Sequence, residues 1–156
     1  MIESQPSHKT APRPVLVADD DAAIRALIAR VLVQLGLVPV LVGDGAAAID
    51  VVEARRSELA CALLDIEMPG ANGLDAAHVI QRLAPDLPIM LISGSIPNVA
   101  AGKLSRLRLA GTLDKPFSLA ALRKLIRHAL AQGATSDRPV GMGQTQLTDV
   151  VASASE

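Results

Sequence analysis

Acidic residues stand at two points of the chain where a short apolar run ends. Asp65 closes the continuous run 61–64, and a loop rich in proline, glycine and asparagine follows it. Asp19 and Asp20 close a similar run at 15–18. Continuous apolar runs bounded by turn residues are typical of buried strands in parallel sheets, and open α/β sheets bind ligands at the carboxyl ends of their strands. We therefore expect these carboxylates to face a ligand at one edge of a sheet.

Carboxylates gathered in one crevice need a positive partner. At a separation of about 5 Å and an effective dielectric constant near 20, each pair repels by about 3 kcal/mol. A hard divalent cation with oxygen ligands relieves this repulsion. Mg²⁺ fits best, because it binds through one or two carboxylates, keeps several waters and completes its shell with phosphate oxygens.

Two later strand ends carry other polar groups. Ser93 follows the apolar run 89–92, and Lys115 follows the last short strand. Alone, Ser93 and Asp65 are typical turn residues and Lys115 is typical of an exposed lysine. Together, at successive strand ends, they indicate a carboxylate, a hydroxyl and a counter-charge at one site.

The elements that must position these groups alternate between strand and helix. Apolar residues at helical spacing, with Asp21 as N-cap and Gly36 as stop, predict the first helix. Pro39 lacks the amide hydrogen that a central strand needs, so the second strand should lie at an edge. Ser118 is expected to cap the last helix. The predicted strands are 15–18, 37–42, 60–64, 89–92 and 111–114, and the predicted helices are 22–35, 46–56, 74–83, 98–109 and one from 119 up to 131.

This alternation predicts an α/β fold, a parallel sheet with helices on both faces. Right-handed crossovers and an edge second strand favour the order 2-1-3-4-5. In that order the first and third strands are neighbours, so Asp19, Asp20 and Asp65 meet in one crevice. Ser93 and Lys115 then come from the next strand ends.

Composition narrows the classes of function. The chain of 156 residues is 50% hydrophobic, with a net charge of −1 and scattered basic residues, so it has no nucleic-acid signature. Cys61, in a predicted buried strand, fits a reducing compartment. The N-terminal segment lacks the apolar core of a signal peptide, and the most hydrophobic stretch, 31–42, is too short to span a bilayer. We expect a cytoplasmic protein without nucleic-acid or membrane partners, with one domain at 15–131 between a disordered leader (1–14) and a disordered tail (132–156).

Taken together, these motifs resemble the receiver domain of two-component response regulators, of the single-domain chemotaxis-regulator type. The resemblance covers about Val15 to Ala131 and implies a flavodoxin-like (βα)5 fold. The motifs that carry it are Asp19-Asp20, the run Asp65-Ile66-Glu67-Met68-Pro69-Gly70-Ala71-Asn72-Gly73, Ser93-Gly94 and Lys115-Pro116-Phe117.

The resemblance implies that Asp65 is a phospho-acceptor. Its carboxylate would take a phosphoryl group from a phosphohistidine on a histidine kinase or a histidine phosphotransfer protein. Mg²⁺ would be bound by Asp20, Asp65 and the backbone carbonyl of Glu67, with Asp19 acting through water.

The same resemblance implies how the modification is sensed. Lys115 would pair with the phosphoryl oxygens, with a cis Lys115–Pro116 bond aiming it into the site, and Ser93 would move to bind the phosphoryl group. Thr112 stands where this family usually has a Tyr or Phe whose rotation reports the modification, so the usual aromatic switch is missing.

Three interpretations follow. The first is a stand-alone receiver that is not an enzyme, assists at most its own phosphorylation and dephosphorylation, and signals by altered binding to another protein; homodimerisation stays open. The second is a phosphorylation-independent interaction scaffold, which Thr112 favours and the intact acidic site opposes. The third is a Mg²⁺-dependent phosphohydrolase with an aspartate nucleophile. Such enzymes place the nucleophile after the first strand with an Asp two residues on, whereas here it follows the third strand and Glu67 takes that place.

Overall fold

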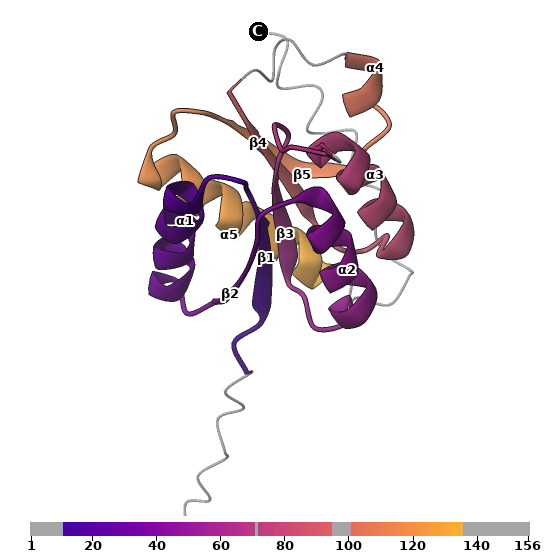
Figure 1. The fold of residues 1–156 in the computed structure, drawn as a ribbon. Coiled ribbons are helices and arrows are strands. Elements are labelled where there is room, and N and C mark those ends of the chain that lie inside the picture. Colours follow the sequence, from indigo (N-terminus) through magenta and orange to yellow (C-terminus); the bar gives the residue numbers. More distant parts are fainter. Residues whose placement is uncertain (1–10, 71, 95–100, 136–156) are drawn as a thin grey trace, which may run out of the picture.

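A five-stranded parallel sheet forms the centre of the protein, seen in a computed structural model that describes residues 11–70, 72–94 and 101–135 (Figure 1). The strand order is β2-β1-β3-β4-β5, which confirms the predicted order. The strands are β1 (Pro14–Ala18), β2 (Val38–Val42), β3 (Cys61–Asp65), β4 (Ile89–Ser93) and β5 (Leu109–Asp114). The helices are α1 (Ala22–Gln34), α2 (Gly45–Arg55), α3 (Gly73–Leu83), α4 (Ala101–Leu104) and α5 (Leu119–Thr135).

Helices cover both faces of the sheet, as predicted (Figure 1). Successive side chains of a strand point to opposite faces, so each central strand contributes to two cores. On one face Leu64 lies in a cluster with α2 and α3, and on the other Leu63 packs with α1 and α5. All five residues of β3 and of β4 are buried. This double burial explains why these strands are continuous apolar runs rather than alternating ones.

Strand β2 lies at the edge of the sheet, and Pro39 suits that place. The amide of Val38 donates to the Arg13 carbonyl (3.4 Å), and the amide of Asp19 donates to the Val42 carbonyl (3.2 Å). The polar backbone groups of Val38 and Val42 therefore face β1. By alternation Pro39 faces the open side, where no strand requires its missing amide hydrogen.

The predicted starts of α1 and α5 and the predicted end of α1 are confirmed by their caps. Asp21 Oδ1 accepts hydrogen bonds from the amides of Ala23 (2.8 Å) and Ile24 (3.3 Å). Gly36, just beyond α1, has a φ of 78°, a left-handed conformation that ends helices at little cost for glycine. Ser118 Oγ accepts from the Ala121 amide at 3.1 Å.

The fourth helix differs from its prediction. The pattern predicted a helix over 98–109, but α4 spans only Ala101–Leu104, and β5 already begins at Leu109. Leu109 pairs with Ile89 of β4, and the buried Leu107 lies between the two elements. Pairing with a neighbouring strand outweighs a weak helical pattern here. Residues 95–100, which include the start of that predicted helix, lie outside the described residues.

The ends of the domain are only partly described. Pro14 already belongs to β1, and α5 continues past position 131 to Thr135. Residues 1–10 of the predicted leader and residues 136–156 of the predicted tail lie outside the described residues. Among the helices that are described, none combines the length and the apolar character needed to cross a membrane.

Candidate functional site

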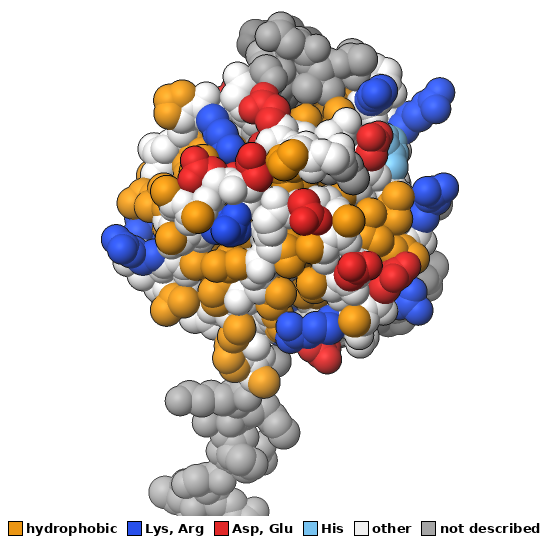
Figure 2. Space-filling view, viewed as in Figure 1, with side chains coloured by type: hydrophobic (Ala, Val, Ile, Leu, Met, Phe, Trp, Pro, Cys, Tyr) orange, Lys and Arg blue, Asp and Glu red, His pale blue; other side chains and the backbone are white. Residues whose placement is uncertain are grey.

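The carboxyl ends of β1 and β3 bring three acidic residues together. These strands are neighbours, with Ala18 in register with Leu64, so the residues that follow them share one rim of the sheet. Asp19 is 1% exposed and Asp65 2%, whereas Asp20 is exposed. One carboxylate oxygen of each lies within 4.8 Å of the others. Figure 2 shows acidic side chains gathered on this upper rim of the molecule.

Lys115 reaches the same place from the end of β5. Its amide donates to the Ser93 carbonyl at 2.9 Å, which ties the start of the following loop to the end of β4. Its Nζ donates to Asp19 Oδ2 and to Asp65 Oδ2, both at 3.1 Å. The Lys115–Pro116 peptide bond is cis. One ammonium group therefore bridges the two buried carboxylates.

Backbone amides hold the opposite oxygen of each buried carboxylate. Asp19 Oδ1 accepts from the Asp21 amide at 2.9 Å, and Asp65 Oδ1 accepts from the Glu67 amide at 3.1 Å. Both side chains are thus turned so that their Oδ2 atoms converge on Lys115. Such paired hydrogen bonds are what buried carboxylates require.

Burial and hydrogen bonding have opposite effects on the pKa values of Asp65 and Lys115. Burial raises the pKa of Asp65 above its ordinary value, and the hydrogen bonds from Lys115 and the Glu67 amide limit that rise. Burial acts to lower the pKa of Lys115, but its hydrogen bonds to Asp19 and Asp65 outweigh burial, and the net shift is upward. Lys115 is therefore a firmly protonated cation beside a carboxylate that is costly to keep charged.

Ser93 and Glu67 form a second polar pair at this rim. Ser93, at the end of β4, is fully buried, and its Oγ donates to Glu67 Oε1 at 3.1 Å. Glu67 is exposed in the loop after β3. Thr112 is an exposed residue of β5, in register with Leu91. The structure therefore gathers the predicted acidic residues, Lys115 and Ser93 along one edge, with Thr112 further back on the last strand.

Two further residues support the site. Arg25 of α1 donates from Nη1 to the Asp19 carbonyl at 2.6 Å, which fixes the end of β1. Gly73 begins α3, and a Cβ there would collide with the backbone carbonyl of Asp65. Arg25 was not predicted, because an arginine one turn after the Asp21 cap specifies no contact. Gly73 ends the motif that starts at Asp65, but the motif does not specify this close approach.

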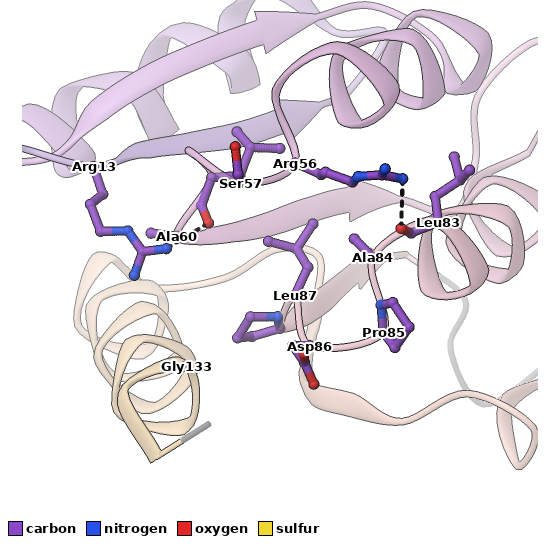
Figure 3. A pocket seen from close by; sticks show the side chains of 12 residues that line it. Arg13, Arg56, Ser57, Ala60, Leu83, Ala84, Pro85, Asp86, Leu87 and Gly133 are labelled. Carbon is purple, nitrogen blue, oxygen red and sulfur yellow. Dashed lines mark hydrogen bonds between the residues drawn. The ribbon is translucent and has the colours of Figure 1, made fainter. Parts of the chain in front are cut away.

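A cavity of about 680 Å³ opens at the opposite, amino-terminal edge of the sheet (Figure 3). Arg13 and Arg56 line it, and both are exposed. Arg13 donates to the Leu59 carbonyl at 3.0 Å, and Arg56 donates to the Leu83 carbonyl at 3.3 Å. Both arginines therefore brace the turns around this cavity.

The fold and the rim together define a class of protein. A five-stranded parallel sheet in this order, with an acidic cluster and a bridging lysine at its carboxyl edge, is that of a signalling receiver domain. Residues 15–127 match the family model described as the response regulator receiver domain. The chain belongs to this family.

Relatives from signalling systems agree with this assignment. The chain is 34% identical over 137 residues to the autoinducer 1 sensor kinase/phosphatase LuxN of Vibrio campbellii, covering 83% of this chain and 16% of LuxN. It is 33% identical over 118 residues to the DNA-binding transcriptional regulator NtrC of Rhizobium meliloti, covering 76% of this chain and 24% of NtrC. The chain thus matches less than a quarter of each of these larger proteins.

A solved structure shows the same fold. The receiver domain of the sensor histidine kinase PA1611 from Pseudomonas aeruginosa superimposes with a TM-score of 0.69 at 23% identity, covering 78% of this chain and 99% of that domain. That structure has a magnesium ion coordinated in its active-site cleft.

Proposed function

We propose that this chain is a receiver that accepts a phosphoryl group on Asp65 in a Mg²⁺-dependent reaction and signals by altered binding to another protein. The observation that carries the proposal is the pairing of Asp65 Oδ2 with Lys115 Nζ at 3.1 Å, at the rim shared with Asp19 and Asp20. The donor is a phosphohistidine of a histidine kinase or a histidine phosphotransfer protein, as is general for receiver domains.

The reaction needs a nucleophile and neutralised charge. A carboxylate oxygen of Asp65 attacks phosphorus, a P–O bond forms, and the P–N bond of the phosphohistidine breaks, with its electron pair returning to the imidazole nitrogen. Lys115 lies where it can pair with the incoming phosphoryl oxygens. Such transfers depend on positioning and electrostatic stabilisation rather than on further covalent steps.

The donor set fits magnesium. The oxygens of Asp19, Asp20 and Asp65 lie within 4.8 Å of one another, and hard oxygen ligands of this kind suit Mg²⁺. In the proposed site Asp20, Asp65 and the backbone carbonyl of Glu67 bind the ion, and Asp19 acts through water. When bound, Mg²⁺ supplies charge neutralisation for the phosphoryl oxygens. The magnesium in the cleft of the PA1611 receiver domain supports this assignment.

The output is proposed to begin at Ser93, at the end of β4. Ser93 is proposed to donate to the phosphoryl group and so start a conformational change. Moving a two-state surface from mostly inactive to mostly active takes about 5.5 kcal/mol of differential binding. Because Thr112 replaces the usual aromatic, a phosphorylation-independent scaffold is the second candidate. Partner affinity measured with and without beryllofluoride, a phosphoryl mimic, separates the two.

Mass spectrometry after incubation with acetyl phosphate and Mg²⁺ tests the acceptor. The wild-type chain gains one phosphoryl group, and Asp65→Asn gains none. Asp50→Asn, an exposed aspartate of α2, serves as the matched control and is labelled like wild type. Equal labelling of Asp65→Asn contradicts the proposal. A phosphotransfer profile against purified histidine kinases then identifies the donor.

A further inference from the structure

Glu67 contacts both the proposed acceptor and the proposed switch residue. Its amide donates to Asp65 Oδ1 at 3.1 Å, and its side-chain Oε1 accepts from Ser93 Oγ at 3.1 Å. Ser93 is fully buried, whereas Glu67 is exposed. The two residues come from adjacent strand ends, because β3 and β4 pair directly.

We infer that Glu67 is a positioning residue that competes with the phosphoryl group for the Ser93 hydroxyl, and thereby weakens the hold of the site on that group. This inference rests on the proposed function. A serine hydroxyl carries one proton, so a hydrogen bond to Glu67 is given up when the same proton turns to a phosphoryl oxygen. Switching therefore exchanges the charge-assisted hydrogen bond from Ser93 to Glu67 for one from Ser93 to the phosphoryl group. The loss of the first bond makes binding of the phosphoryl group less favourable.

The surroundings of Glu67 make the exchange feasible. Gly94 follows Ser93, and a Cβ at Gly94 would lie 3.6 Å from Glu67 Oε2, so the carboxylate sits against a backbone without a side chain. Once released, the exposed Glu67 carboxylate is hydrated by water. Release of Glu67 from Ser93 therefore strands no buried charge.

The side chain of Glu67 also brings a negative charge to the rim, and the test must separate charge from hydrogen bonding. Glu67→Gln removes the charge and keeps an oxygen acceptor for Ser93. Glu67→Ala removes both. Both variants lack the charge, and comparing their difference with and without the Ser93 hydroxyl isolates the hydrogen bond from the size and the amide donors of Gln.

The experiment measures beryllofluoride affinity in the presence of saturating Mg²⁺, by fluorine NMR, for both Glu67 variants in the wild-type and Ser93→Ala backgrounds. In the wild-type background Glu67→Ala binds at least about threefold more tightly than Glu67→Gln, as expected for the loss of one hydrogen bond. In the Ser93→Ala background the two variants bind equally. Where Ser93→Ala fails to fold, Ser93→Cys replaces it, since a thiol is a weak donor.

The outcomes distinguish this inference from the proposed function. A wild-type chain that binds no beryllofluoride with Mg²⁺ contradicts both. A wild-type chain that binds normally, with Glu67→Ala and Glu67→Gln equal to each other, overturns the role of Glu67 alone. A difference in affinity between Glu67→Ala and Glu67→Gln that persists unchanged in the Ser93→Ala background also overturns the role of Glu67.

Discussion

Lys115 Nζ lies 3.1 Å from Asp65 Oδ2, although the two residues are 50 positions apart in the chain. The same nitrogen bonds Asp19 Oδ2 at 3.1 Å, so one cation pairs with two carboxylates that are almost fully buried. Removing one partner from such an arrangement leaves charge that is both buried and unpaired.

Lys115→Gln should lower the free energy of unfolding by about 2 kcal/mol in chelator, because Asp19 and Asp65 lose their shared cation. The Lys115 side chain is 20% exposed, so this value lies below that of a fully buried pair. Urea unfolding provides the measurement. Lys124→Gln on the exposed side of α5 is the control and should change stability by less than about 0.5 kcal/mol. Equal losses in the two variants would contradict the structural role of Lys115.

Asp20→Asn should raise the melting temperature in chelator, because it relieves repulsion by the two neighbouring carboxylates. The same change should abolish the increase in melting temperature that Mg²⁺ gives the wild-type chain, since ligand binding to the folded state stabilises it. Thermal melts with and without Mg²⁺ measure both effects. Asp50→Asn should respond to Mg²⁺ like wild type. An Asp20→Asn protein that Mg²⁺ stabilises normally would argue against this carboxylate as a ligand.

Gly73→Ala should destabilise the fold by about 2–3 kcal/mol, because the added Cβ meets the backbone of Asp65 and has no flexible neighbour to displace. The matched control is Gly102→Ala in α4, where no atom lies within 4 Å of the new Cβ. That change should be neutral or stabilising by up to about 1 kcal/mol, as expected from helix propensity. If chemical denaturation gives the two variants the same stability, the close approach of α3 to the end of β3 is refuted.

Stability should fall between pH 8.5 and 10 because of Cys61. Burial raises the pKa of Cys61 from 9.0 to about 12, and the positive charge of Arg13 opposes the rise. In this range the unfolded thiol releases its proton and the folded thiol keeps it, so each pH unit lowers the free energy of unfolding by up to about 1.4 kcal/mol. The chain has no tyrosine to titrate in the same range. Lys115 does not contribute to the loss there, because its raised pKa keeps it protonated in the folded state.

Urea titrations at several pH values test the effect, and Cys61→Ala is the comparison. The variant should show a flatter dependence on pH, whatever its stability at pH 7. A Cys61→Ala protein with the same slope as wild type would show that another group causes the loss.

The strand order and the first and last helices were predictable, because they depend on patterns of residues that are close together in the sequence. The unbroken apolar run of β3 indicated burial on both faces, and Pro39 indicated an edge strand. With right-handed crossovers, these two features leave few possible sheet orders. The same order implies that Asp19 and Asp65, which follow neighbouring strands, share one rim. The amphipathic pattern and the caps at Asp21 and Ser118 located the first and last helices.

The short α4 was not predictable in the same way. Its segment has a weak helical pattern, and the extension of β5 to Leu109 depends on pairing with Ile89, about 20 residues away in the chain. No local propensity reports such a pairing. The sequence could therefore indicate that an element lies here without giving its boundary.

By itself, the sequence determined which side chains end the strands, because the apolar runs and the turn residues after them are local patterns. Backbone chirality then limited the strand orders, and hence which strand ends are neighbours. Only the tertiary structure decided where those side chains point: Lys115 to both buried carboxylates, Ser93 to Glu67, and Arg25 to the Asp19 carbonyl. The reason is physical. Rotamers at a rim are chosen by hydrogen bonds between residues distant in sequence, and the backbone pattern does not encode them.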